Sequence, residues 1–548
     1  MRSRSLLVIM LATLATLLVA QPPSSGAQAA PNAMATPIPV AERGAYIRKD
    51  APTNAMINRL WDEGMNRSQA MPLAQVLLDP FGSRLTASPQ SDAALDWLMK
   101  IYQGWDVRAR KHQYGTWLGW NRGVSHVDLV SPRVRSLEAM ALAWSPGTGG
   151  GPVEGEVVTY PADVSTPEQF DAWLPNVKGK IFLMSVPRLS CRSTAQWQEF
   201  GTPEEVQRVT AAQLEMQQAW NQTNVAMSGG RNVWLKLKDA GALAVFTAQF
   251  SGSPGVNKVF GSPTQTVPSF AVGCEDYSLL FRMAQNKQAP RVRAFTDSEL
   301  LGTRPVGNVI AEIRGSEKPE EYVVLSAHFD SWSAASGATD NGTGTIMMLE
   351  AMRILKQVYP NPKRTIIVGH WNGEEQGLNG SRAFSEDHPQ VVSGLQALFN
   401  QDNGTGRVVS MTAGPFPGAA ARLEQYLAEL PNEITQWIRF QPTSTQATGG
   451  TDHASFVCYK APAFNLGALS WDYNNSTWHT DRDTYDKVVE SDIKNNATLV
   501  AMLAFMASED PERMPRDVMN PLPGGRNGEP GTWRECAKAA RAVPNAVR

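Results

Sequence analysis

The sequence predicts an α/β fold, with a mixed central sheet covered by helices on both faces and a β-rich segment inserted into it. After residue 304, apolar strands alternate with helices, which is typical of a sheet covered on both faces. Between residues 153 and 293, short β-rich runs separated by turns replace this alternation. The chain of 548 residues is long enough for two or three domains.

The predicted elements follow in order along the chain. A helical pattern runs from about residue 71 to 105, with a turn at residues 82–85. The inserted segment carries the strand candidates GEVVTY, GKIFLMSV, GALAVFTAQF and VPSFAVG, with one helical run, VWLKLKDAG, before the third. The strand candidates VGNVIAEI and EYVVLSA come next, followed by a helix from about Gly342 to Val358 and then the strand RTIIVGHW. After about residue 510 the chain is rich in Pro and Gly, which favours a surface-hugging or partly disordered tail.

These shifts in pattern divide the chain into five segments. The predicted order is a signal peptide (1–29), the first part of the main domain (30–145), the inserted domain (146–298), the second part of the main domain (299–515) and the tail (516–548).

The N-terminal residues predict export. Arg2 and Arg4 precede an apolar run, and Ala27-Gln28-Ala29 fits the small-x-small rule for signal peptidase. An uncleaved membrane anchor is the alternative, but the run from residue 6 to 20 is short for a bilayer span. We therefore expect a secreted or periplasmic protein with no membrane contact in its mature form.

Charge and cysteine content exclude some functions and leave others open. A net charge of -2 gives no reason to expect nucleic acid as a partner. The four cysteines contain no C-x-x-C pair, which argues against a cysteine metal site. Export makes disulfides feasible, but sequence cannot choose among the three pairings.

Acidic and imidazole side chains follow the predicted strands of the main domain. In open α/β sheets, ligands bind beyond the carboxyl ends of the strands, so these side chains are expected to meet at one rim. The candidates are His328, Asp330, Asp340, Glu374, Glu375, Asp402 and His479.

Such a cluster indicates a metal site. Unpaired carboxylates would repel one another and raise each other's pKa, whereas bound cations would hold them together. Nitrogen and oxygen ligands without thiolate fit zinc, with manganese or cobalt as weaker candidates. Each residue alone also has a structural interpretation: Asp340 could cap its helix, and His370 is best interpreted as a hydrogen-bonded core histidine.

The adjacent pair Glu374 and Glu375 suggests a division of labour. Neighbouring residues at the end of a strand cannot both point at one metal ion. One glutamate can therefore be a ligand while the other acts as a general base.

Five segments carry a resemblance to a known family. HFDSWSAASGATDNGTG, NGEEQGLNGS, NQDNGTG, GGTDHASF and STWHTDRDT resemble the co-catalytic zinc exopeptidases, which include bacterial aminopeptidases and glutamate carboxypeptidases. HFDSW followed by DNGTG, together with NRS and GSRLTAS near the N-terminus, most resembles the carboxypeptidase Q branch. The inserted segment is weakly similar to the protease-associated domain of these enzymes.

The resemblance implies a role for each matched residue. Two zinc ions would be held, one by His328, Asp340 and Asp402, the other by Asp340, Glu375 and His479, with Asp340 bridging. Glu374 would be the general base for attack by a zinc-bridged hydroxide on a peptide carbonyl, and Asp330 would orient the first histidine. The implied substrate is a short peptide or dipeptide, and a homodimer is one implied assembly.

Two departures from the family pattern limit what is implied. Several relatives place a Tyr before the DHxxF stretch, whereas TQATGG stands here, so the oxyanion contact is unassigned. His453 could contact the substrate or the intermediate, or have a structural role beside Asp452. The sequence leaves open whether the enzyme is an aminopeptidase or a carboxypeptidase or dipeptidase. It also leaves room for a hydrolase of a non-peptide amide and for a non-catalytic receptor-like ectodomain.

Overall fold

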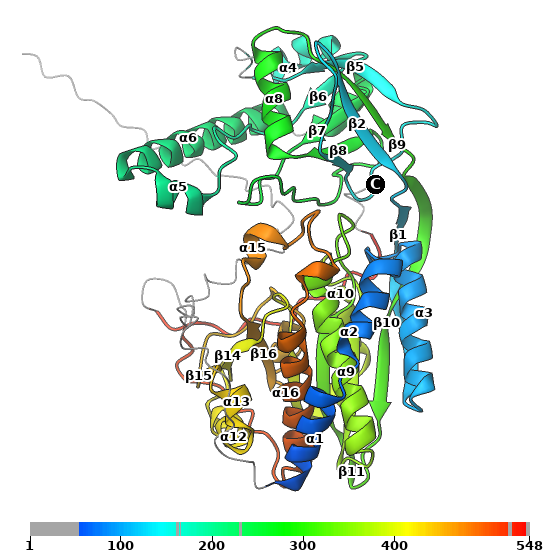
Figure 1. The fold of residues 1–548 in the computed structure, drawn as a ribbon, viewed down its shortest axis with the longest axis vertical. Helices are drawn as coiled ribbons and strands as arrows, with labels where there is room; N and C mark the ends of the chain where they lie inside the picture. The colour runs from blue at the N-terminus through cyan, green and yellow to red at the C-terminus, as the bar shows by residue number, and fades with distance from the viewer. Residues whose placement is uncertain (1–53, 161–163, 165, 229–232, 524–528, 544–548) are drawn as a thin grey trace, which may run out of the picture.

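The computed structural model describes residues 54–543 apart from 161–163, 165, 229–232 and 524–528. The predicted signal peptide at residues 1–29 lies outside the described residues. Two eight-stranded mixed sheets form two units, one above the other in Figure 1. We call residues 125–296 the second unit and the remaining described residues the first unit.

The first unit is built on a sheet whose four central strands are parallel. In spatial order its strands are β1 (Arg108–Asn121), β10 (Glu299–Ile313), β12 (Arg364–Trp371), β11 (Lys318–His328), β13 (Leu395–Asn400), β16 (Ala463–Ala468), β14 (Val408–Thr412) and β15 (Arg439–Gln441). Every residue of β12 and of β13 is buried, so both faces of the sheet are covered. This is the predicted α/β class, and that prediction is confirmed.

Helices cover this sheet because they bury apolar residues against it or against one another. Helix α9 (Thr343–Val358) packs against α16 (Glu490–Glu509), and both contact β11. The other helices with seven or more residues are α1 (Ala55–Asn66), α2 (Ala70–Val76), α3 (Pro89–Gly104), α10 (Asn379–Asp387) and α12 (Pro417–Glu429). Among the described residues, no helix is long and apolar enough to cross a membrane.

The second unit surrounds a sheet of its own. Its strands, in spatial order, are β3 (Arg135–Ser136), β2 (Ser125–Ser131), β9 (Arg291–Thr296), β5 (Val153–Val158), β6 (Ile181–Leu183), β7 (Ala244–Thr247), β8 (Ser269–Val272) and β4 (Ala139–Ala141). It also contains α4 (Pro167–Trp173), α5 (Thr194–Phe200), α6 (Pro203–Ser228), α7 (Val233–Asp239) and α8 (Cys274–Gln285). This sheet includes β2, β3 and β4, which precede residue 146, where the insertion is predicted to begin. The predicted domain boundaries stay a prediction.

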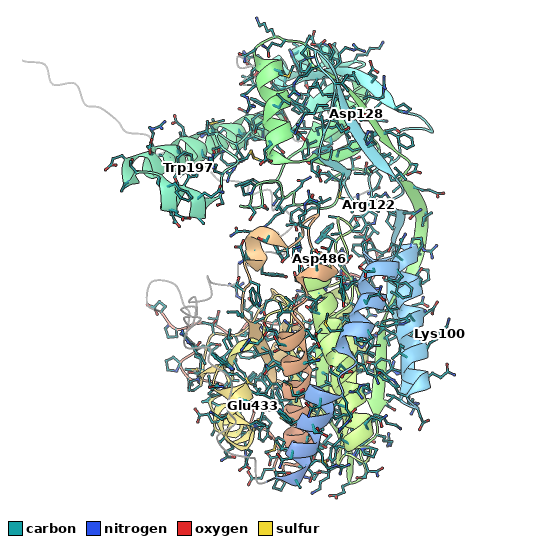
Figure 2. The ribbon with its side chains drawn as sticks, in the orientation of Figure 1. Lys100, Arg122, Asp128, Trp197, Glu433 and Asp486 are labelled. Atoms are coloured by element: carbon teal, nitrogen blue, oxygen red, sulfur yellow. A yellow bond between two sulfur atoms is a disulfide. The ribbon has the colours of Figure 1, made fainter. Side chains whose placement is uncertain are left out.

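The chain crosses between the two units twice, and the crossings lie side by side. Asn121 at the end of β1 pairs with Glu299 of β10, and Ser125 of β2 pairs with Thr296 of β9. The connection is therefore a two-stranded ribbon that runs from one sheet into the other (Figure 1). Figure 2 shows the described side chains on the ribbon drawing of the chain, with Asp128 labelled in the second unit and Glu433 in the first.

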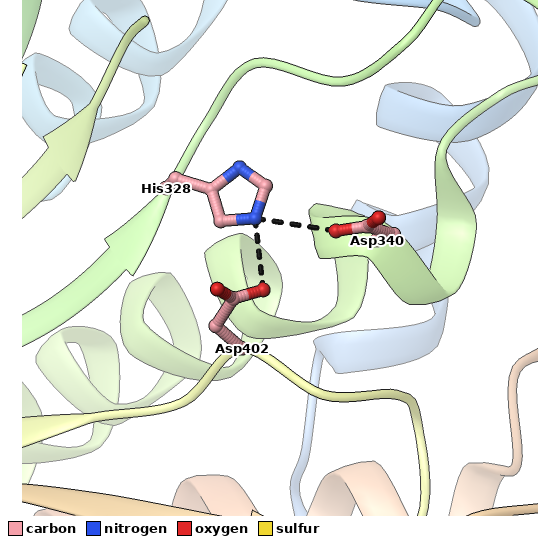
Figure 3. A group of neighbouring side chains, drawn as sticks. All are labelled: His328, Asp340 and Asp402. Atoms are coloured by element: carbon pink, nitrogen blue, oxygen red, sulfur yellow. Dashed lines mark hydrogen bonds and ion pairs between the residues drawn. The ribbon is translucent and has the colours of Figure 1, made fainter. Parts of the chain in front are cut away.

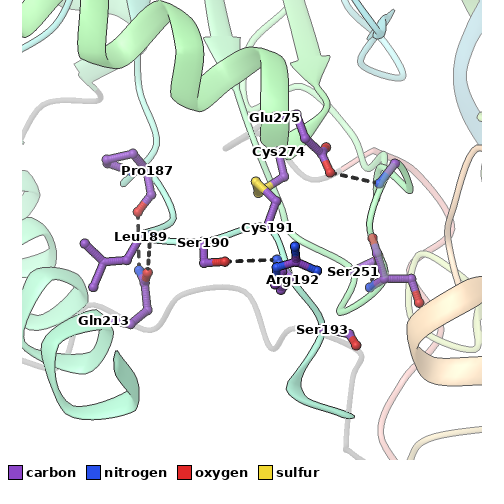
Figure 4. The surroundings of a disulfide bond; sticks show 12 residues. Pro187, Leu189, Ser190, Cys191, Arg192, Ser193, Gln213, Ser251, Cys274 and Glu275 are labelled. Atoms are coloured by element: carbon purple, nitrogen blue, oxygen red, sulfur yellow. Dashed lines mark hydrogen bonds between the residues drawn. A yellow bond between two sulfur atoms is a disulfide. The ribbon is translucent and has the colours of Figure 1, made fainter. Parts of the chain in front are cut away.

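Each of the two disulfides joins cysteines of the same unit. Cys191 pairs with Cys274 in the second unit, where it ties the segment before α5 to the start of α8 (Figure 4). Cys458 pairs with Cys536 and holds the C-terminal tail against the first unit. The described part of the tail is further fixed by Arg541, which pairs with Glu386 and Asp387.

Candidate metal centre

The sheet topology brings the predicted ligands to one rim. His328 is the last residue of β11, Glu375 follows β12 and Asp402 follows β13, and these three strands are parallel. Asp340 lies in the turn at Ala338–Gly342 that leads into α9. His479 arrives from a loop before α16. The carboxyl ends of parallel strands share an edge, which explains the convergence.

The ligand candidates form two groups that share Asp340. In the first group, His328 Nε2 lies 3.3 Å from Asp340 Oδ1 and 2.9 Å from Asp402 Oδ1 (Figure 3). In the second, His479 Nε2 lies 3.1 Å from Asp340 Oδ2 and 3.0 Å from Glu375 Oε2. Asp340 therefore directs one oxygen to each group. These are the same two groups that the family resemblance implies.

The chemistry of the donors fits divalent cations. Glu375 Oε1 is buried without a hydrogen-bond partner in the part of the chain that the structure describes. Burial raises the pKa of Glu375 to about 7, and the charge of Asp340 adds to the effect. Burial alone would lower the pKa of His479, but the facing carboxylates of Glu375 and Asp340 raise it to about 9. The cluster thus draws positive charge to itself, and nitrogen and oxygen donors of this kind suit zinc.

Glu374, the predicted general base, is buried beside these groups. Its side chain is 7% exposed. Burial raises its pKa well above the usual range, and the charges of Asp402, Asp452 and Glu375 push it in the same direction. A carboxylate with a raised pKa accepts a proton readily near neutral pH.

Asp330 supports the loop that carries both glutamates. Its carboxylate accepts the backbone N–H of Glu374 at 3.1 Å and of Glu375 at 3.2 Å, and the Thr86 hydroxyl donates to it at 3.1 Å. The His328 ring contacts Asp330 chiefly through the backbone, because Nδ1 donates to the carbonyl oxygen at 2.9 Å while the carboxylate is 3.7 Å away. The predicted orientation of His328 by the carboxylate stays a prediction.

His453 lies at the N-terminal end of α14 (Ala454–Val457). Its side chain makes no hydrogen bond to the metal-ligand candidates within the described residues, and burial lowers its pKa to about 4. The neighbouring carboxyl of Asp452 is fully buried, which raises its pKa to about 7. A substrate contact for His453 stays a prediction.

Two residues that support the site have no role in the sequence analysis. Asp483 accepts the backbone N–H of Thr339 at 2.8 Å and of Asp340 at 3.1 Å, which fixes the turn that carries Asp340. Arg84 is fully buried and donates to the backbone carbonyls of Phe329, Ser336 and Gly337. Both residues lie in segments that carry the family resemblance, STWHTDRDT and GSRLTAS, but residue type alone does not reveal contacts with backbone.

Aromatic side chains line the second group of ligand candidates. Trp478 stacks on His479 with ring centroids 4.0 Å apart, and Trp332 lies 5.9 Å from the same ring. Phe260 of the second unit meets His479 edge to face at 4.9 Å. The second unit therefore forms part of the wall of the site.

Comparisons with known proteins agree with this arrangement. Residues 308–504, which carry all the ligand candidates, match the model described as Peptidase family M28. The chain contains a peptidase family M28 domain. This match and the curated relatives below confirm the predicted family and the predicted enzyme class, a metallo-exopeptidase.

Relatives of the M28 domain extend the similarity over most of the chain. Carboxypeptidase Q from Xenopus laevis is 25% identical over 83% of this chain and 88% of its own length. The human carboxypeptidase Q is 23% identical over 84% of this chain and 90% of its own length.

Solved structures support the fold. The crystal structure of a peptidase M28 precursor from Shewanella amazonensis superposes with a TM-score of 0.60 at 21% identity, over 86% of this chain and 98% of that one. The zinc aminopeptidase BSAP from Bacillus subtilis gives 0.51 at 17% identity, over 80% of this chain and 94% of that one.

Proposed function

We propose that this protein is a secreted exopeptidase with two zinc ions, which hydrolyses the terminal peptide bond of short peptides or dipeptides. The observation that carries the proposal is Asp340, whose two oxygens face two separate groups of one histidine and one further carboxylate each. A shared carboxylate of this kind is how proteins hold a pair of metal ions.

The residues present would divide the work as follows. His328 and Asp402 would hold one ion, Glu375 and His479 the other, and Asp340 both. Bound zinc supplies a Lewis acid that polarises the scissile carbonyl and lowers the pKa of water. Glu374 would take a proton from the attacking water on its carboxylate and return it to the leaving amine. Burial suits Glu374 to this task, since its raised pKa allows it to hold the proton between the two steps.

The relatives support the exopeptidase assignment in different ways. Carboxypeptidase Q, as its name says, acts at the carboxyl end of its substrate, and this similarity spans both units. BSAP is described as a zinc aminopeptidase, which supports zinc as the metal. The two names disagree about which end of the peptide is recognised, and the residues of the M28 domain alone do not decide it.

A contrast between the adjacent glutamates tests the proposal. Glu374→Gln should keep two zinc ions per chain and lower kcat by at least about 100-fold on a dipeptide, because a general base is lost and no ligand is. Glu375→Gln should lose bound zinc, which elemental analysis of the dialysed protein would detect. Glu424→Gln, at an exposed position of α12, is the control and should change neither quantity. Wild-type kcat in Glu374→Gln would contradict the proposed mechanism.

Export is the second part of the proposal. Both disulfides suit an oxidising compartment, and the predicted signal peptide at residues 1–29 would direct the chain there. N-terminal sequencing of the protein recovered outside the cytoplasm should find a new N-terminus near residue 30. Recovery of the intact N-terminus would contradict cleavage. The predicted homodimer stays a prediction.

A further inference from the structure

A loop of the second unit is bound directly to the segment that carries His479. Val259 N donates to the His479 carbonyl at 3.0 Å, and Asp481 N donates to the Asn257 carbonyl at 3.0 Å. Lys258 and Thr480 form the antiparallel bridge between them. The backbone therefore fixes Lys258 next to the metal-ligand candidate His479.

Lys258 is a buried cation that forms no ion pair within the described part of the chain. Its side chain is 9% exposed, and no carboxylate oxygen of the described residues lies within 4.0 Å of its Nζ. Nζ lies 4.2 Å from the ring centroid of Trp478, the residue that stacks on His479. A cation–π contact offsets only part of the cost of burying an ammonium group.

Lys236 shows how the same unit pairs another buried lysine. It is equally buried, at 9% exposed, and lies 5.9 Å from the ring centroid of Phe170. Its ammonium group, however, pairs with Asp171 at 2.8 Å. Lys258 has the burial and the aromatic contact without the carboxylate, and it lies at the wall of the metal centre.

We propose that Lys258 binds the free α-carboxylate at the C-terminal end of the peptide, so that the enzyme recognises the carboxyl end. This rests on the proposed exopeptidase function. A carboxylate is the complement of an ammonium group, whereas the α-ammonium of a peptide N-terminus would be repelled by it. Burial lowers the pKa of Lys258 to about 8, with the charge of Asp340 opposing the shift, so the side chain is mainly charged at neutral pH.

Arg382 is the competing cation near the site. It lines a cavity of about 220 Å³ together with Ser455, Arg534 and Glu535, and none of the ion pairs of the described residues includes its guanidinium. The observations favour Lys258 because the charge of Arg382 is already opposed by the nearby carboxylates of Asp452 and Glu374. Lys258 is also the cation whose backbone is bound to the segment of a metal-ligand candidate.

Binding measurements without turnover test the proposal. In zinc-loaded full-length Glu374→Gln protein, titration calorimetry compares a dipeptide with its C-terminal amide. The free acid should bind at least about tenfold tighter, as expected for a charge-assisted hydrogen bond. Lys258→Met in the same background should remove this preference, and Lys258→Arg should retain most of it. Lys238→Met, which changes an exposed lysine of the same unit, should leave the preference unchanged.

The outcomes separate the two proposals. Three outcomes would each overturn the role of Lys258. The Glu374→Gln protein could bind the acid and the amide equally well, Lys258→Met could leave the preference for the acid unchanged, or Arg382→Met could remove that preference. Zinc content is measured in each variant, because a purely structural role would change zinc content or folding but not the ratio between acid and amide. The affinities of Lys258→Gln for the acid and the amide are measured in parallel, and they replace those of Lys258→Met if that variant does not fold. Lysine-dependent binding of the acid, together with no peptide hydrolysis by the zinc-loaded wild type, would instead count against the proposed function alone.

Discussion

Asp330 influences the site through the backbone of its neighbours. Its fully buried carboxylate accepts the N–H groups of both Glu374 and Glu375, so one side chain sets the position of the proposed base and of a proposed ligand. Such supporting contacts commonly change metal affinity or activity by about 10- to 100-fold when they are removed.

Asp330→Asn should therefore lower kcat/KM by about 10- to 100-fold and weaken zinc binding. An amide side chain has one acceptor oxygen, and its NH₂ group would face a backbone N–H that now lacks an acceptor. Steady-state kinetics and zinc titration would measure both effects. Thr86→Val removes only one donor to Asp330 and should have a smaller effect. Unchanged kinetics and zinc affinity in Asp330→Asn would show that the loop needs no such support.

At the level of single residues, the sequence predicts the groups that carry chemistry but does not reveal which groups hold the backbone. His328, Asp340, Glu375, Asp402 and His479 stand at strand ends or in conspicuous motifs, and the structure brings them together. Asp483 acts by accepting N–H groups of the Asp340 turn. That role depends on where two distant loops meet, which no local pattern encodes.

At the level of elements, a buried contact joins α3 to β12. The Tyr102 hydroxyl lies 2.7 Å from His370 Nε2, and both residues are fully buried, as expected for a core histidine. Burial lowers the pKa of His370 to about 3. The folded protein therefore holds this imidazole neutral down to acidic pH, whereas the unfolded chain protonates it near its ordinary pKa of about 6.5.

This difference makes the contribution of His370 to stability depend on pH. It should be fully present above about pH 6.5 and be lost as the pH falls toward 3, by about 1.4 kcal/mol per pH unit. His370→Gln does not titrate and can still accept from Tyr102. The free energy of unfolding of the wild type, relative to this variant, should fall by about 2 kcal/mol between pH 7 and pH 5. Denaturant unfolding at both pH values measures it, and a constant difference would refute the assignment.

Strands and buried helices are predicted better than exposed helices. The runs VGNVIAEI, EYVVLSA and RTIIVGHW fall within β10, β11 and β12, and the helix predicted from about Gly342 to Val358 is α9. The second unit is less β-rich than expected, because α6 is a long helix there. Its described side chains are mostly exposed, so no apolar stripe marks it in the sequence.

For the whole molecule, zinc should act as a stabilising ligand. Zinc added to the metal-free protein should raise the thermal midpoint, since a ligand at 100 times its Kd adds about 2.7 kcal/mol to the stability of the folded state. Asp340→Asn should lose most of this shift because Asp340 faces both groups. Scanning calorimetry measures the shift, and magnesium at the same concentration is the control, since it prefers sites with oxygen ligands alone. An equal shift with magnesium would argue against a nitrogen-containing zinc site.

The global arrangement is the part least accessible from sequence. Alternating patterns indicate two kinds of sheet, but not that the loop at residues 257–259 lies against residues 479–481. The cysteine pairing is hidden for the same reason. The paired cysteines are 83 positions apart in one disulfide and 78 in the other, and sequence does not give distances in space.

The placement of the disulfides has a mechanical consequence. Both disulfides lie within one unit each, and no cysteine is left to join the two units. A force that separates the units is therefore not resisted by a disulfide. It is borne by the ribbon at residues 121–125 and 296–299 and by the hydrogen bonds between residues 257–259 and 479–481. Further contacts between the units share the load, among them the hydrogen bond from Trp144 to the Leu118 carbonyl and the ion pair of Arg482 with Glu138. His479 lies on one side of this seam and Lys258 on the other. Separating the units would therefore remove Lys258 and Phe260 from beside the metal-ligand candidate His479.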